Sequence, residues 1–243
     1  MAANLAGPNG HLTLLAVTAE SGTGAHATAD ISPKRAELVL SNARRIAHDR
    51  GVPCNTVVDP GSPPVDVILA RARDHDLFAI GAPATSWLGG MLLGGVATVA
   101  LSEFTTPMLV VRRSFTSLRG HRILVASDGE DGSDRLVDLA GRLAQNQGAD
   151  VTLVHAPGVE SKTNTRAIEA QARALQLAAP DAGEPLVEPG KPWDVILEAA
   201  EHRKAALLVI GSRRLSGLGA FGSVSRRVVH DAPCSVLVVP PNG

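Results

Sequence analysis

The chain has 243 residues and a formal net charge of −1 at pH 7, a length that suits one large domain or two ordinary ones of roughly 100–150 residues each. Acidic and basic residues are nearly balanced, and the short arginine pairs are not interleaved with aromatic residues, which argues against a nucleic-acid partner. Hydrophobic residues make up 44% of the chain, enough for a core, yet no apolar run approaches the roughly 20 residues that span a bilayer.

The N-terminus and the cysteines bear on cellular location. Met1 is followed by Ala-Ala-Asn, without the basic and long apolar regions of a signal peptide. Cys54 and Cys234 allow one disulfide, but free thiols in the reducing cytosol are the simpler interpretation. We therefore predict a cytoplasmic protein without a membrane segment.

The first predicted elements of the chain are the end of a helix and a strand. Residues 2–10, AANLAGPNG, are typical of the last turn of a helix and its C-terminal cap, and residues 11–18, HLTLLAVT, predict a strand. The next helix is expected to start near Pro33. Further strands are predicted at residues 76–81 and 107–111.

The second half alternates strands and helices without interruption. Apolar runs predict strands at residues 121–127, 151–156, 185–189, 206–211 and 235–239. Amphipathic or Ala/Leu-rich stretches predict helices at residues 134–148, 165–179, 193–203 and 223–230. This alternation is typical of an open parallel sheet covered by helices on both faces.

The two halves are copies of each other. GSPPVDVIL at 61–69 matches GKPWDVIL at 190–197, and HLTLLAVT matches DVTLVHAP at 150–157. We predict a duplication with domains at residues 1–114 and 120–243, joined by a short polar link near 112–120. Because HLTLLAVT matches the second strand of the repeat, the first copy lacks its opening strand and most of its first helix.

Several segments of the two copies match one known family: residues 123–129 (ILVASDG), 152–156 (TLVHA) and 209–239, and in the first copy 79–95 and 105–111. On these segments both copies resemble the universal stress protein family. It implies an α/β fold of two tandem flavodoxin-like domains with open parallel sheets of strand order 3-2-1-4-5, the first of them truncated. It also implies a homodimer, and ATP, with or without Mg²⁺, at the point where the strand order reverses.

The nucleotide-binding members of this family carry Gly, two residues, Gly, nine residues, then Gly and Ser or Thr. In the second copy Gly211 and Gly222-Ser223 keep the ends of this pattern, but Arg214 replaces the middle glycine and only seven residues follow it. Arg214 either clamps phosphate or fills the space that phosphate would use. In the first copy the spacing holds, but Ala84 and Gly95 replace the second glycine and the hydroxyl residue.

The resemblance places a nucleotide site in the second copy. Glycines let the backbone approach phosphate, and the helix that follows offers free N–H groups. Asp128, after the first strand, can accept from adenine or ribose donors, whereas His155 is more simply a packed histidine. The predicted nucleotide-binding residues are Asp128, Ala156, Ile210, Gly211, Arg213, Arg214, Gly222, Ser223, Val224 and Ser225.

The missing strand of the first copy is central in a 3-2-1-4-5 sheet, so strands 2 and 4 would have unpaired edges. Three solutions are open: the natural chain starts upstream, another segment or chain supplies the strand, or strands 2 and 4 close up. The first copy also lacks a counterpart of Asp128, and we predict that it does not bind ATP in the family manner.

Three functions are consistent with these features. The first is a stress protein that senses adenine nucleotide, and the second is a nucleotide-free interaction module that dimerises through its last strand. The third is a hydrolase, which would need a base or a metal-holding carboxylate near the loop. Asp128 and Asp131 are the near candidates, and neither has a partner in sequence. We therefore predict no catalytic residue, no resident metal and at most slow ATP hydrolysis.

Overall fold

The computed structural model describes residues 1–7, 9–18, 32–60, 63–82, 95–112, 117–130, 133–157, 165–212 and 222–240. Its contacts divide the chain into two compact units, Met1–Asp76 and Leu77–Gly243. The second unit therefore contains the whole second copy together with the last part of the first. In the described residues no helix is long and apolar enough to cross a membrane.

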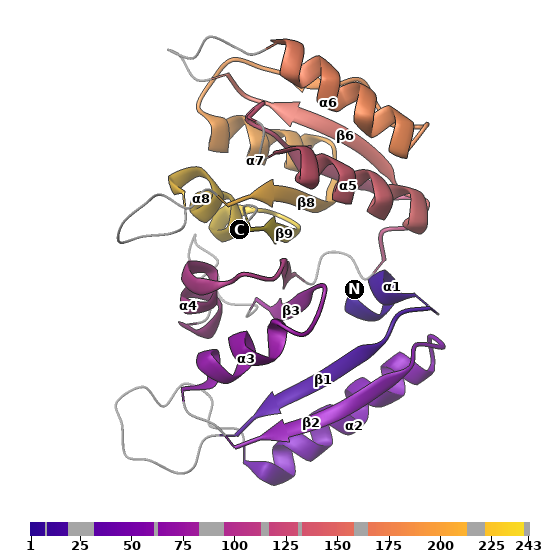
Figure 1. The fold of residues 1–243 in the computed structure, drawn as a ribbon, viewed down its shortest axis with the longest axis vertical. Coiled ribbons are helices and arrows are strands. Elements are labelled where there is room, and N and C mark those ends of the chain that lie inside the picture. Colours follow the sequence, from indigo (N-terminus) through magenta and orange to yellow (C-terminus); the bar gives the residue numbers. More distant parts are fainter. Residues whose placement is uncertain are drawn as a thin grey trace. The chain divides into compact units, whose positions relative to one another are not determined.

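A seven-stranded sheet organises the second unit (Figure 1). Its order is β3-β4-β9-β8-β5-β6-β7. The second copy contributes five of these strands, in the order β7-β6-β5-β8-β9 and all parallel, which confirms the predicted 3-2-1-4-5 arrangement. Their bounds are β5 Arg122–Ala126, β6 Asp150–His155, β7 Leu186–Val187, β8 Ala205–Gly211 and β9 Ser235–Val239.

Two pairs of helices cover this sheet. Right-handed crossovers place the pairs on opposite faces, and α5 packs against α6 while α7 packs against α8. α5 ends as predicted at Gly148, which adopts the left-handed conformation with φ +59°. β8, the middle strand of the seven-stranded sheet, is buried over its first six residues, as its continuous apolar run predicts. The bounds are α5 Asp134–Gln147, α6 Thr165–Ala178, α7 Pro192–His202 and α8 Ser223–Asp231.

The last strands of the two copies pair with each other inside the second unit. β4 (Met108–Val111) runs antiparallel to β9, with Leu109 opposite Leu237, and β3 (Phe78–Gly81) lies parallel to β4 on its other side. The helix α4 (Gly95–Glu103) connects β3 to β4. Because β4 occupies the outer edge of β9, the second copy has no free last strand.

Arg112, directly after β4, links this strand by hydrogen bonds to β9 and to the end of α8. Its backbone N–H donates to Ser235 Oγ (3.0 Å), and its Nη2 donates to the carbonyls of Val229 (2.6 Å) and His230 (2.9 Å) at the C-terminal end of α8. The side chain is buried, and desolvation lowers its pKa. The predicted polar link thus begins with a buried arginine.

The first unit has a small parallel sheet. β1 (Leu12–Val17) pairs with β2 (Cys54–Asp59), and α2 (Pro33–His48) packs on both strands. Ser32 caps α2, so this helix begins at Pro33 as predicted. α1 (Ala2–Ala6) and α3 (Pro64–Ala72) complete the unit.

The strands of the first copy are divided between two sheets. Strands 2 and 3 of the repeat are β1 and β2, and strands 4 and 5 are β3 and β4, which belong to a different sheet. In the described residues no strand of the first copy occupies the position that β5 holds in the second. Strands 2 and 4 accordingly do not pair with each other in the described sheets.

Candidate functional site

The carboxyl ends of β5, β6 and β8 form the candidate site. β5 is the central strand of the second copy, with β6 on one side and β8 on the other. The chain leaves β5 toward α5 and leaves β8 toward α8, on the opposite face. Such a switch point opens a crevice at the ends of the strands, where open α/β sheets bind their ligands.

Asp128 lies in the turn that follows β5. Its Oδ1 accepts from the Glu130 backbone N–H (3.0 Å) and from Ser133 Oγ (2.8 Å). Gly129 in the same turn has φ +78°, a conformation that favours glycine. The carboxylate is therefore oriented by its own turn, and the residue remains exposed to solvent.

A buried polar network lies behind this turn. Ser127 Oγ donates to Gln171 Oε1 at 2.5 Å and accepts from the Gly129 N–H at 3.0 Å. The Gln171 amide in turn donates to Asp134 Oδ1 at 3.0 Å. The network ties the turn after β5 and the start of α5 to α6, and so fixes the backbone that carries Asp128.

Ser127 and Gln171 are not among the residues predicted from the sequence. Gln171 falls in the buried stripe of α6 and is only 4% exposed. A glutamine on the apolar face of an Ala/Leu-rich helix was the available signal, because a buried amide requires hydrogen-bond partners.

His155, the last residue of β6, is buried as its packed interpretation predicts. Its Nδ1 lies 2.9 Å from the Ser127 carbonyl oxygen. A carbonyl only accepts, so Nδ1 donates this hydrogen bond. The other ring nitrogen, Nε2, is buried without a hydrogen-bond partner among the described residues. Ala156 follows it and is half-buried.

The second wall of the site is the end of β8 and the start of α8. Ile210 is buried and Gly211 exposed, and Ser225 Oγ donates to the Gly211 carbonyl at 2.7 Å. Gly222 is the N-cap of α8 and makes no side-chain cap. A Cβ added to Gly211 or to Gly222 would meet no atom of the described residues within 4 Å. The described part of the chain therefore leaves space at both glycines.

The structure brings most of the predicted residues to one edge of the sheet. Eight of them lie at the ends of β5, β6 and β8 or in the first turn of α8: Asp128, Ala156, Ile210, Gly211, Gly222, Ser223, Val224 and Ser225. Arg213 and Arg214 lie outside the described residues, as do Asp131 and Ala84. No group of three His, Cys, Asp or Glu residues in the described part of the chain is arranged to hold a metal ion.

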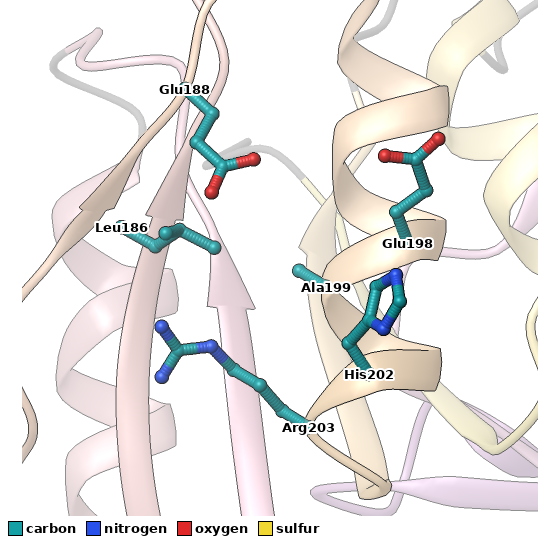
Figure 2. Close-up of a pocket in the computed structure, with 6 residues that line it drawn as sticks. All are labelled: Leu186, Glu188, Glu198, Ala199, His202 and Arg203. Atoms are coloured by element: carbon teal, nitrogen blue, oxygen red, sulfur yellow. The ribbon is translucent and has the colours of Figure 1, made fainter.

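A separate groove runs between β7 and α7 (Figure 2). It has a volume of about 330 Å³ and none of the predicted site residues line it. The carboxylates of Glu188 and Glu198 point into it from opposite walls, and Arg203 reaches beneath Leu186. It is lined by Leu186, Glu188, Glu198, Ala199, His202 and Arg203.

Comparisons with known proteins agree on one family. The model of the universal stress protein family matches residues 1–112 and 120–240. A relative from Thermus aquaticus, named as the universal stress protein in the QAH/OAS sulfhydrylase 3′ region, is 36% identical over 132 residues, which are 48% of this chain and 96% of the relative. A universal stress protein of Mycolicibacterium smegmatis is 28% identical over 192 residues, 72% of this chain and 65% of that protein.

Among solved structures, a universal stress protein from Archaeoglobus fulgidus matches nearly the whole chain. The TM-score is 0.79 at 22% identity, with 96% of this chain and 88% of that chain covered. At this level of identity the likeness shows the fold alone.

Proposed function

Because the chain belongs to the universal stress protein family, we propose that its second copy binds an adenine nucleotide, and specifically ATP, in a regulatory rather than a catalytic role. The observation that carries this proposal is the switch point between β5 and β8. There an exposed, pre-oriented Asp128 shares one edge of the sheet with two glycines at which the described residues leave room for a side chain.

Each part of the site has a physical role in this proposal. The Asp128 carboxylate accepts from ribose hydroxyls or from the adenine amino group. Ala156 and Ile210 give the base an apolar surface. The phosphates lie at Gly222, Ser223 and Ser225, where the N-terminal end of α8 offers N–H groups and a positive dipole. Mg²⁺, where it is bound, arrives with the nucleotide.

The first copy does not bind ATP in this proposal. It has no central strand among the described residues, so nothing places a carboxylate where the second copy has Asp128. We therefore expect one nucleotide per chain.

The alternative function is a nucleotide-free interaction module. The observation that bears on it is the β4–β9 pair, which closes the last strand of the second copy within the same chain. A second copy would have to displace β4 to pair with β9. We therefore expect any homodimer, as the family resemblance implies, to form through a different surface.

Calorimetric titration of ATP into the purified chain tests the nucleotide proposal, with Asp128→Ala and Gly222→Arg as site variants. The repeat also supplies a matched pair, because Gly81 ends β3 as Gly211 ends β8, and the described residues leave space for a side chain at both. We expect Gly211→Val to abolish binding and Gly81→Val to leave it unchanged. Absence of heat and of co-purified nucleotide in the wild-type chain would contradict the proposal, and two sites per chain would contradict the inactive first copy.

A further inference from the structure

The helix α8 is held at both of its ends. At its N-terminal end, Ser225 Oγ donates to the carbonyl of Gly211, the last residue of β8 (2.7 Å). At its C-terminal end, Arg112 Nη2 donates to the carbonyls of Val229 (2.6 Å) and His230 (2.9 Å). The nine residues of α8 span only about 13 Å, so a shift of the C-terminal anchor also moves the N-terminal turn.

The C-terminal anchor of α8 belongs to the first copy. Arg112 directly follows β4, the last strand of that copy, and its backbone N–H donates to Ser235 Oγ in β9 (3.0 Å). Its guanidinium suits the end of a helix, where the last carbonyls lack intrahelical partners and the helix dipole is negative. The first copy therefore contacts the helix whose other end forms the proposed phosphate site.

Stability alone does not explain an arginine at this position. Arg112 is 3% exposed, and its Nε and Nη1 atoms are buried without hydrogen-bond partners in the described structure. Unpaired buried groups cost free energy, and apolar side chains of similar volume often replace buried charges without loss of stability. An apolar side chain cannot supply the two directed hydrogen bonds that fix the end of α8.

The sequence excludes the reverse contact, from the second copy to the first, at the equivalent position. The last strands align as MLVV at 108–111 and VLVV at 236–239, which places Pro240 at the position of Arg112. Proline has neither a backbone N–H nor a polar side chain, so Pro240 cannot donate to the end of α4. At this pair of positions the anchoring therefore runs in one direction, toward the copy that has Asp128.

We propose that Arg112 is a positioning residue for the nucleotide site, through which the last strand of the first copy holds α8 in the orientation that binds phosphate. This inference rests on the proposed function of the second copy and adds a role for the first. Arg112 bonds to α8 and β9, whereas Asp128 and Ala156, which we assign to the ribose and the base, follow β5 and β6. Arg112 should therefore contribute to phosphate binding and not to adenosine binding.

Calorimetric titration of ATP and of adenosine separates these two contributions. Arg112→Met fills much of the same space without donors, and Arg112→Lys keeps a charged donor. Coupling through a shared structural element typically changes affinity by about 5–150-fold, and we expect Arg112→Met to weaken ATP binding by about tenfold and adenosine binding by less than about twofold. Arg112→Lys should weaken ATP binding less than Arg112→Met does.

Arg122→Met is the matched control. Arg122 also donates to the end of a helix in the same unit, from Nη1 to the carbonyl of Arg203 after α7 (3.4 Å), and α7 contains none of the predicted nucleotide-binding residues. The control should leave the ratio of ATP affinity to adenosine affinity unchanged. An equal fall of this ratio in both variants, or an equal loss of ATP and adenosine binding in Arg112→Met, would overturn the positioning role. All variants are checked for a cooperative urea transition.

Amide hydrogen exchange provides a readout that needs no nucleotide. The Arg226 N–H bonds to the Gly222 carbonyl (3.0 Å) and closes the first turn of α8. Arg112→Met should speed exchange of this amide by about tenfold and leave exchange in α5 unchanged. A wild-type chain that binds no ATP would contradict the proposed function, and exchange at Arg226 would still decide whether Arg112 holds α8. Unchanged exchange at Arg226 would overturn the inference.

Discussion

The contact between α5 and α6 predicts that Gly141→Ala lowers the stability of the wild-type protein but raises it once Ala178 is replaced by glycine. A Cβ at Gly141 would lie 2.6 Å from Ala178 Cβ and 3.4 Å from Leu175 Cδ1. The leucine tip can move, but the Ala178 methyl group is fixed to the helix backbone, so α5 and α6 must separate. We therefore predict that Gly141→Ala destabilises the protein although alanine favours helices.

The magnitude follows from two opposing terms. Replacing glycine by alanine inside a helix stabilises it by about 1 kcal/mol. Overpacking a close contact costs about 2 kcal/mol, which leaves a net loss of about 1 kcal/mol. Removing the opposing methyl group with Ala178→Gly relieves the contact, so in that background Gly141→Ala should stabilise by about 1 kcal/mol. The coupling between the two positions is then about 2 kcal/mol.

Urea unfolding of the four proteins measures this cycle. Both tryptophans, Trp87 and Trp193, fall within residues 77–243, so their fluorescence follows the unit that contains α5 and α6. A Gly141→Ala variant that is more stable in both backgrounds would refute the reasoning, because the two helices would then have room for the methyl group.

Three further predictions concern buried polar groups. Burial raises the pKa of the Cys234 thiol to about 12 from 9.0, so iodoacetamide should label half-buried Cys54 well before Cys234 in the native protein. Because this pKa is raised on folding, its contribution to stability is complete below about pH 9 and is lost as the pH rises toward 12; Cys234→Ala should flatten urea stability between pH 8 and pH 10. Arg112→Ala should destabilise by about 2–4 kcal/mol in urea, by uncapping two carbonyls and leaving a cavity. Arg112→Met should cost less, because it fills the space and removes the Nε and Nη1 groups that are buried without partners in the described structure. Gln171→Leu should cost about 1–3 kcal/mol and, if ATP binds at Asp128, should also weaken ATP binding in calorimetry, whereas unchanged stability would show that its hydrogen bonds with Ser127 and Asp134 are not maintained.

Local pattern was enough to predict the elements of the second copy. The strand predicted at 235–239 is β9, and the helix predicted at 134–148 ends at Gly148. Continuous apolar runs and a glycine stop act within a few residues of chain, so they can be read without the fold. The strand order 3-2-1-4-5 did not come from local pattern, because it was predicted from the resemblance to the universal stress protein family.

The residues that support the candidate site were harder to predict. Ser127 and Gln171 are 44 positions apart in sequence, and their hydrogen bond exists because α6 packs beside β5. His155 was correctly interpreted as packed, but its bond to the Ser127 carbonyl depends on the register of β5 and β6. Such contacts depend on how elements dock, which no local pattern specifies.

The sequence by itself predicted an α/β chain with an internal repeat, with its glycines and Asp128 at the ends of strands. Tertiary structure alone decided that β4 pairs antiparallel with β9 and that Arg112 is buried at that junction. The physical reason is that an apolar residue in the sequence indicates only that its side chain tends to be buried. The element that packs against it is set by contacts between residues far apart in the chain.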